Sequence, residues 1–591
     1  MLYPIRNKFR QVIDLSGFWK FKLDKEKKGE EEKLFNGFES DIEIALPGSW
    51  NEQLEETGLL HYIGSAWYCT NVFIPEEFKN KKVWIRVGSA DYNSKIWING
   101  NYVGENHCGF LPFEFEIGNY AKPGLQAVIV ILINNELDED TIPQGITSDH
   151  YFKENRLREE TYPPTRFDFS PFGGIHRPVL IYTTPAKYLE KIKFDSTILS
   201  NKKVVAEIKV KTQNFNEGLV RATISSHGFT ISTEVQLTKN SAKLELEIEN
   251  CELWMPQNPF QYDLHVQIVE GNNFIDEYGL PLGIREVKIV KNKLFLNGEE
   301  VFLRGFGKHE DFWAVGKGLF LPLIVKDFQL FKWINANSFR TSHYPYSEEI
   351  MQYADRHGIL IIDEVPAVSI DTRFATNKTI QNHKESITRL FERDYNHPSV
   401  IMWAIGNEPN LVGADSYYNG SGKKYWKQIF EHARSLDKSR PFTVPNCQRA
   451  GIDDPVFEFS DVLSINRYYG WYENPGQIRK AIELMEKEMD ALHKKHNKPV
   501  FVTEFGADTM PGLHSTSEQM FTEEYQAKLI EEYIKLIESK DYTIGEHIWN
   551  FADFRTPQHF RRVVMNLKGV FTRSREPKLA AFRIKELWGK K

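Results

Sequence analysis

From residue 288 onward, short apolar strands alternate with helical stretches, and this alternation limits the possible folds more than any other feature of the sequence. Eight strand-like segments are found at about 302–305, 338–341, 359–362, 400–405, 442–444, 462–465, 500–503 and 544–549. In one helical stretch, 522–539, Tyr525, Leu529 and Tyr533 share a face, and Thr522 is a residue type that caps helices. Eight strands that alternate with helices predict a (β/α)8 barrel.

The residues before 288 show the alternation that is typical of β-strands. Trp19, Phe21 and Leu23 alternate with lysines, and the pair Asn99-Gly100 is typical of a hairpin turn. After residue 184 the same period of two continues through segments such as 204–210 and 264–268. We therefore expect an all-β sandwich followed by an immunoglobulin-like sandwich of about 100 residues.

Composition excludes several classes of protein. The 591 residues carry a formal net charge of -7, which offers no basic surface for nucleic acid. The four cysteines are widely spaced and form no cluster with histidines, so we expect reduced cysteines, no metal site and no cofactor. No apolar run is long enough to span a membrane, and the N-terminus lacks the apolar core of a signal peptide. We therefore expect a cytoplasmic protein without a membrane or nucleic-acid partner.

Polar residues follow most of the predicted barrel strands. They include His309, His343, Asn407, Glu408, Asn466, Tyr468, Glu504 and Trp549. In a (β/α)8 barrel the chemistry takes place at the carboxyl ends of the strands. We expect these side chains to converge on one rim.

Two of these residues are carboxylates that follow buried strands. Glu408 stands after the fourth strand in Asn407-Glu408-Pro409, and Glu504 ends the seventh in Thr503-Glu504-Phe505-Gly506. A glycosidase that retains the configuration of its sugar needs two carboxyl groups about 5 to 5.5 Å apart. Two acids at strand ends of a shared rim can meet that requirement.

These two segments resemble the active-site signatures of glycoside hydrolase family 2, and the resemblance covers essentially the whole chain. It implies an N-terminal jelly-roll β-sandwich that binds sugar (1–184), an immunoglobulin-like β-sandwich (185–287) and a C-terminal (β/α)8 catalytic barrel (288–591). It also implies Glu408 as the general acid/base and Glu504 as the nucleophile, with no metal ion. For these two roles we expect burial and the neighbouring charge to raise the pKa of Glu408.

The choice of sugar has to be inferred from the site, because the family also contains β-galactosidases and β-mannosidases. A glucuronide carries a carboxylate at C5, which requires a cation and hydrogen-bond donors. The segment Asn566-Leu567-Lys568 resembles the motif by which β-glucuronidases bind that carboxylate. The resemblance therefore implies a β-glucuronidase in which Asn566 and Lys568 bind the sugar carboxylate.

Other segments of the chain resemble those that bind the sugar in β-glucuronidases. The implied substrate-binding residues are Asp168, His309, His343, Asn407, Asn466, Tyr468, Tyr472, Trp549 and Arg562. Among them, Asn407 is expected to bond the sugar 2-hydroxyl, Tyr468 to support the nucleophile, and Asp168 to reach the sugar hydroxyls from the first domain. His309 and His343 are expected to be sugar ligands or to orient other ligands.

The expected reaction is the hydrolysis of terminal β-D-glucuronic acid from small-molecule or oligosaccharide glucuronides, through a covalent glycosyl-enzyme on Glu504. A β-galacturonidase or a dual activity is the first alternative, followed by a β-galactosidase or β-mannosidase. A carbohydrate-binding protein without catalysis is the remote alternative. The resemblance also implies a homo-oligomer, either a dimer or a tetramer. The short segment 365–382 after the third strand leaves no room for a long covering loop, so we expect an open site.

Overall fold

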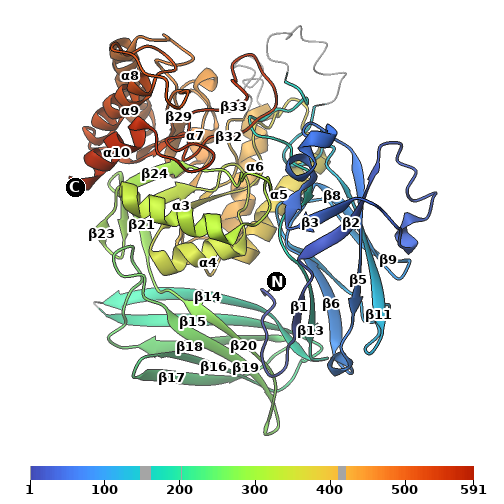
Figure 1. The fold of residues 1–591 in the computed structure, drawn as a ribbon. Helices are drawn as coiled ribbons and strands as arrows, with labels where there is room; N and C mark the ends of the chain where they lie inside the picture. Colours follow the sequence, from blue (N-terminus) through green and yellow to red (C-terminus); the bar gives the residue numbers. More distant parts are fainter. Residues whose placement is uncertain (1, 147–160, 201, 410–420, 591) are drawn as a thin grey trace.

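The computed structural model describes residues 2–146, 161–200, 202–409 and 421–590, which form two β-sandwiches and a barrel (Figure 1). The first sandwich, blue in Figure 1, lies beside the barrel, and the second lies below the barrel. This arrangement matches the fold class expected from the sequence. No helix in the described ranges is both long and apolar enough to cross a membrane.

The first sandwich consists of two main sheets with strand orders β3-β2-β5-β11-β8-β9 and β1-β13-β6-β10, and a small sheet β4-β12-β7. Trp19 and Phe21 of β2 are buried in its core, as their alternation with lysines predicts. Asn99 and Gly100 join β8 to β9 with positive φ angles, which confirms the expected hairpin turn. The elements are β1 (Val12–Asp14), β2 (Gly17–Asp24), β3 (Glu43–Leu46), β4 (Gly48–Ser49), α1 (Trp50–Gln53), β5 (Ser65–Phe73), β6 (Lys82–Val87), β7 (Ala90–Asp91), β8 (Asn93–Ile98), β9 (Asn101–Asn106), β10 (Phe113–Glu116), β11 (Gln126–Asn134), β12 (Gly174–Ile175) and β13 (Val179–Thr184).

The second sandwich packs the sheet β14-β15-β18 against the sheet β17-β16-β19-β20. In β18, buried and exposed residues alternate without exception, so Leu244, Leu246 and Ile248 enter the core. The strands are β14 (Tyr188–Ser200), β15 (Lys203–Gln213), β16 (Leu219–Ser226), β17 (Phe229–Gln236), β18 (Ser241–Ile248), β19 (Tyr262–Glu270) and β20 (Asn273–Leu282).

A three-stranded sheet precedes the barrel and covers the amino-terminal ends of the barrel strands. Its strands are β21 (Val287–Val290), β22 (Lys293–Leu296) and β23 (Glu299–Glu300). Leu294 and Leu296 are buried in one cluster with Leu303, Leu360 and other residues near the barrel floor. Because the amino ends of the strands are covered, their carboxyl ends form the open face of the barrel.

The barrel strands follow the order β28-β27-β26-β25-β24-β31-β30-β29, and parallel pairing of β24 with β31 joins the first strand to the last. Between β28 and β29 the barrel is closed by a bridge between Asn446 and Ile465. The eight strands agree with the predicted segments to within two residues at each end. They are β24 (Leu303–Gly307), β25 (Ser338–Arg340), β26 (Leu360–Glu364), β27 (Val400–Ala404), β28 (Phe442–Thr443), β29 (Leu463–Asn466), β30 (Val500–Glu504) and β31 (Thr543–Ile548).

Helices surround these strands, and α9 shows how the sequence specifies them. Its N-cap Thr522 accepts a hydrogen bond from the backbone of Tyr525, and Tyr525, Leu529 and Tyr533 are buried on one face, as predicted. The helices are α3 (Leu321–Ile334), α4 (Glu348–His357), α5 (Asn377–Asp394), α6 (Ser421–Leu436), α7 (Val456–Phe459), α8 (Ile478–His496), α9 (Glu523–Glu538) and α10 (Leu579–Gly589). A short pair, β32 (Phe554–Arg555) and β33 (Met565–Asn566), follows the last barrel strand.

Buried ion pairs hold the first sandwich against the barrel. Asp91 lies 3.1 Å from Lys317, and Glu52 lies 2.8 Å from Arg573, with all four side chains buried. Such pairs lose their compensation if the two domains separate, so they fix one orientation of the sandwich. This orientation brings the segment 161–168 to the open face of the barrel.

Candidate active site

A cavity of about 330 Å³ opens at the carboxyl ends of the barrel strands. Its wall combines residues that follow β27, β29, β30 and β31 with residues 161–168 of the first sandwich. Ten of the residues expected at the site line it, namely Asp168, His343, Asn407, Glu408, Asn466, Tyr468, Tyr472, Glu504, Trp549 and Arg562. The structure thus brings most of the expected site residues together.

Glu504 ends β30 and is held by two donors. Arg340, at the end of β25, donates to one carboxylate oxygen, and the Tyr468 hydroxyl donates to the other at 2.7 Å. Arg340 is fully buried; although burial opposes its charge, Glu364 and Glu504 raise its pKa above the ordinary value. The carboxylate of Glu504 therefore has a fixed orientation and a permanent positive neighbour.

Glu364 at the end of β26 shares Arg340 with Glu504. It accepts a hydrogen bond from Arg340 and lies 2.8 Å from Nδ1 of His343. The sequence assigns no role to Arg340 or Glu364, although Glu364 follows the third predicted strand, where rim residues are expected. The signal that can find them is a charged residue inside an apolar strand, because a buried charge needs a partner.

Glu408 lies half-buried in the cavity wall, just after β27, with a φ angle of +43°. Its Oε1 accepts a hydrogen bond from Asn466 at 2.9 Å. Burial and the neighbouring Glu504 raise the pKa of Glu408 to about 8, in the direction expected from the sequence. At neutral pH Glu408 therefore carries a proton that it can donate.

Two asparagines connect these carboxyl groups. Asn466 is oriented by Thr503, whose hydroxyl donates to its Oδ1 at 2.7 Å. The Oδ1 of Asn407 accepts from Arg340 and from Asn466, each at 3.3 Å. With its oxygen occupied by these donors, Asn407 is set to present its amide group as a donor at the cavity wall.

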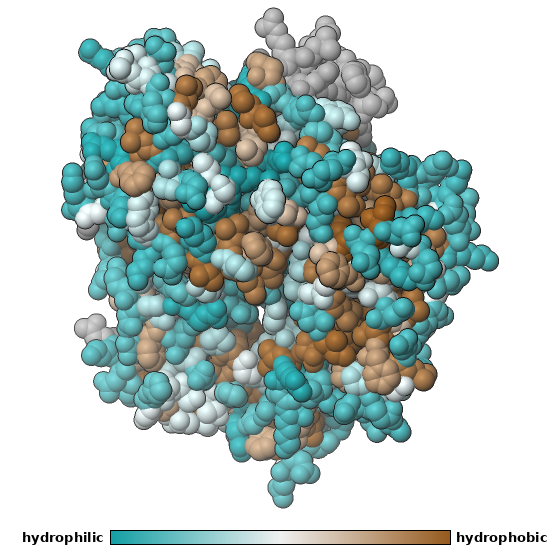
Figure 2. All heavy atoms as spheres, in the orientation of Figure 1, coloured by the Kyte–Doolittle hydropathy of each residue, from teal (hydrophilic) through white to brown (hydrophobic). Residues whose placement is uncertain are grey.

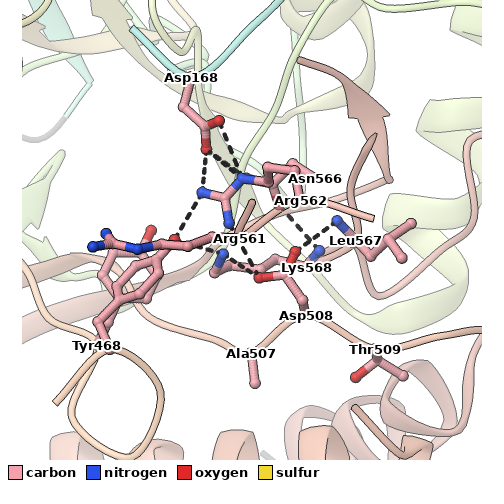
Figure 3. Close-up of polar contacts among 12 residues, drawn as sticks. Asp168, Tyr468, Ala507, Asp508, Thr509, Arg561, Arg562, Asn566, Leu567 and Lys568 are labelled. Atoms are coloured by element: carbon pink, nitrogen blue, oxygen red, sulfur yellow. Dashed lines mark hydrogen bonds and ion pairs between the residues drawn. The ribbon is translucent and has the colours of Figure 1, made fainter. Parts of the chain in front are cut away.

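Positive side chains gather at another part of the wall (Figure 3). Arg562 lies in the cavity wall and donates to both carboxylate oxygens of Asp168 and, at 2.7 Å, to the Tyr472 hydroxyl. Lys568 donates to the same hydroxyl at 2.9 Å, and Asn566 donates to Asp168 at 2.9 Å. Asn566 and Lys568 are fully buried and lie just behind the cavity wall. We call Arg562, Asn566 and Lys568 the cationic cluster.

Asp508, four residues beyond Glu504, contacts this cluster and is a residue that the sequence motifs do not indicate. Its Oδ2 lies 2.5 Å from the Lys568 amine, and its Oδ1 accepts from the backbone of Leu567 at 2.9 Å. The signal in the sequence is only an acidic residue shortly after a barrel strand, which many surface loops share. The contact with Lys568 becomes visible only in three dimensions.

His343 and His309 lie at different depths, the first in the cavity wall and the second buried outside it. His343 lines the cavity and stacks on Trp549 with ring centres 4.9 Å apart. His309 is buried outside the cavity wall, where it packs against Trp549 and Phe554 and bonds the Tyr344 hydroxyl at 3.1 Å. Its position suits a residue that orients Trp549, and it does not suit a direct ligand of the sugar.

The segment between β32 and β33 gives the cavity rim a hydrophobic outer surface. Arg561 and Arg562 line the cavity, whereas Phe560 and Val564 are 78% and 71% exposed. Figure 2 shows hydrophobic side chains gathered in this part of the surface. Such a rim can contact an apolar group attached to a polar sugar.

The described residues hold no group of three or more histidine, cysteine, aspartate or glutamate side chains placed to bind a metal ion. The four cysteines are free and buried. What the cavity does offer is a protonated acid, an oriented carboxylate and a cationic cluster in and just behind its wall. This combination suits acid-assisted nucleophilic displacement on an anionic substrate.

Comparison with known proteins gives full-length matches. Residues 287–591 match the TIM barrel domain of glycosyl hydrolases family 2, residues 12–185 its sugar binding domain, and residues 180–285 a third model of that family. A β-glucuronidase of Paenibacillus borealis is 37% identical over 100% of this chain and 98% of its own length.

Solved structures agree with these matches. A β-glucuronidase of an uncultured Clostridium species is 38% identical, with a TM-score of 0.91 over 100% of both chains. The β-glucuronidase of Ruminococcus gnavus in complex with D-glucuronic acid is 36% identical, with a TM-score of 0.91 over 99% of both chains.

Proposed function

This chain belongs to glycosyl hydrolase family 2, and from that premise we propose that it is a β-glucuronidase acting with retention of configuration. Full-length relatives and solved structures with this name support the proposal. So does a solved relative that holds D-glucuronic acid.

The choice of sugar rests on the cationic cluster, which lies in and directly behind the wall of the cavity that holds the two carboxyl groups. Arg562 and Lys568 supply positive charge, and Asn566 supplies an amide donor. A neutral sugar makes no use of two buried cations, whereas the C5 carboxylate of a glucuronide can bond to them. This cluster therefore favours a glucuronide over a galactoside or a mannoside.

In the proposed reaction, Glu504 attacks the anomeric carbon while Glu408 gives its proton to the leaving oxygen. The bond to the aglycone breaks, and an ester forms between Glu504 and the sugar. Because the ester is neutral, the charge that raises the pKa of Glu408 disappears. Glu408 can then take a proton from water as the water oxygen attacks the anomeric carbon, which breaks the bond to Glu504, frees its carboxylate and releases glucuronic acid.

The surrounding residues take roles that follow from their contacts. Arg340 and Tyr468 orient the nucleophile, and Asn466 orients the acid. We propose that the amide of Asn407 bonds the sugar 2-hydroxyl. Trp549, stacked on His343, supplies an aromatic wall for the sugar ring.

The test is the hydrolysis of p-nitrophenyl β-D-glucuronide beside the matching galacturonide, galactoside, glucoside and mannoside. We expect the glucuronide rate to dominate. A dominant rate on the galacturonide would keep the carboxylate contact but show that the site prefers the opposite configuration at C4 of the sugar. A preference for a neutral sugar would overturn the role of the cationic cluster and leave the two catalytic carboxyl groups in place.

The oligomeric state and the cellular location stay predictions. A homo-oligomer and a cytoplasmic location are expected from the sequence and its resemblance. Light scattering of the purified protein measures the number of subunits, and fractionation of the source cells locates the enzyme.

A further inference from the structure

Two cations lie close together, Arg562 in one wall of the cavity and Lys568 just behind it, and their like charges need negative charges nearby. Lys568 is fully buried, and the side chain of Arg562 is only 9% exposed. Both donate to the same acceptor, the Tyr472 hydroxyl. Like charges that are buried side by side destabilise a fold unless counter-charges lie close to them.

Asp168 supplies one counter-charge, from the cavity side. It belongs to the first sandwich, its side chain is 43% exposed, and it lines the cavity. It occupies donors of Arg562 and Asn566 that a sugar carboxylate would also use. An incoming ligand can therefore compete with Asp168 for these donors.

Asp508 supplies a second counter-charge, on the side of Arg562 opposite to Asp168 (Figure 3). It is 2% exposed and is not part of the cavity lining. Its Oδ2 lies 2.5 Å from the amine of Lys568 and 3.5 Å from Nη1 of Arg562. No ligand in the cavity can take its place without moving Lys568.

The second oxygen of Asp508 fixes the chain that carries the cluster. Oδ1 accepts from the backbone N–H of Leu567, the residue between Asn566 and Lys568. One carboxylate thus holds both the backbone of this segment and the amine at its end. Burial opposes the ionisation of Asp508, but Lys568 and Arg562 outweigh it and lower its pKa below the ordinary value.

We propose that Asp508 is a positioning residue that sets the selectivity of the enzyme for glucuronides, by holding Lys568 and its backbone in the geometry that binds the sugar carboxylate. This inference rests on the proposed function. It assigns Asp508 no contact with the substrate. Its effect on the reaction passes through Lys568.

The first experiment compares wild type and Asp508→Asn on p-nitrophenyl β-D-glucuronide and on the neutral glycoside that wild type hydrolyses fastest. The asparagine keeps the shape and can still accept from Leu567, but it removes the charge and turns a donor toward Lys568. We expect KM for the glucuronide to rise by about 30-fold, since breaking one partner of a buried charge pair has effects of this order. We expect kcat, and kcat/KM for the neutral glycoside, to change by less than about threefold.

Asp553→Asn is the matched control. Asp553 is also 2% exposed and also holds this segment, through the backbone of Gly569 at 3.0 Å, but its partner is Lys578 at 2.8 Å. It does not line the cavity. We expect this variant to lose stability without a selective rise in KM for the glucuronide. Equal selectivity losses in both variants would mean that any damage to the segment has this effect, and would overturn the proposal.

A double-mutant cycle with Lys568→Gln separates a positioning role from a general one. If Asp508 acts through Lys568, Asp508→Asn should have almost no further effect on KM in the Lys568→Gln background. Additive effects would overturn the proposal. Removing both charges together also leaves no unpaired buried ion, so the double variant provides a folded reference if the single variant folds poorly.

Failure of this inference can be told apart from failure of the proposed function. If wild type prefers a neutral glycoside, the proposed function fails. If wild type prefers the glucuronide and Asp508→Asn keeps that preference, the proposed function stands and only the role of Asp508 is wrong.

Discussion

The cavity has two charged regions that are built in different ways. In the catalytic region, Arg340, Glu364 and Glu504 each end a barrel strand, so the parallel ladders of the barrel fix their positions. In the cationic region, Arg562 and Lys568 lie in connecting segments, and their partners come from another loop and another domain. The reaction therefore depends on the barrel framework, whereas the choice of sugar depends largely on connecting segments that can change without moving a strand.

The largest expected effect lies in the catalytic region. Glu504→Ala removes the proposed nucleophile, and kcat should fall about 10³-fold or more on every glycoside that the enzyme accepts. Steady-state rates on the glucuronide and on a neutral glycoside provide the measurement. A loss confined to the glucuronide would mean that Glu504 acts with the cationic region in binding the sugar carboxylate and not as the nucleophile.

Lys568→Ala should have the largest effect in the cationic region. We expect kcat/KM to fall about 100-fold on the glucuronide and by less than about threefold on neutral glycosides, because only the glucuronide carries a charge for Lys568 to bind. Thermal unfolding of the variant serves as the control for stability. Parallel losses on both kinds of substrate would show that Lys568 supports the fold instead of the selectivity.

The pH profile should report the catalytic region alone. Glu408 must carry a proton to act as an acid, and its pKa is raised to about 8 by burial and by Glu504. As the pH rises through this value the proton is lost, so kcat/KM should fall about tenfold per pH unit above it. We expect this alkaline limb with glucuronide and neutral substrates and also in Lys568→Ala. If the limb disappears with Lys568, the two regions are not independent.

The smallest expected effect is that of Tyr472→Phe. The Tyr472 hydroxyl accepts from Arg562 and Lys568 in the cationic region, and its loss removes about 1 kcal/mol of hydrogen bonding, or about a fivefold change in KM for the glucuronide. Tyr468→Phe provides the matching change in the catalytic region, where we expect kcat to fall instead. The reversed pattern would exchange the roles of the two tyrosines.

The sequence was sufficient to predict the fold class because each domain has a clear hydrophobic period. The hydrophobic pattern predicts the eight barrel strands to within two residues and places the residues that directly follow them at the rim. Contacts between side chains from different strands and loops could not be predicted from the sequence. Glu364 binds Arg340 across adjacent strands, and Asp508 binds Lys568 from a position 60 residues away.

Sequence position alone also could not tell which residues at the rim face the cavity. His309 and His343 both follow barrel strands, yet only His343 reaches the cavity wall. The backbone period places a residue at the end of a strand, but side-chain packing against neighbours such as Phe554 decides whether it faces the cavity.

Asp168 and Arg562 stand 394 positions apart in the chain, yet they meet at the cavity wall. The wall is therefore complete only after the first sandwich has docked on the barrel. A folded barrel without that sandwich would keep both catalytic carboxyl groups but lack part of the wall that faces the sugar. Sugar choice in this chain therefore depends in part on the joint between two domains, and replacing the first sandwich alone would exchange the part of the binding surface that residues 161–168 form.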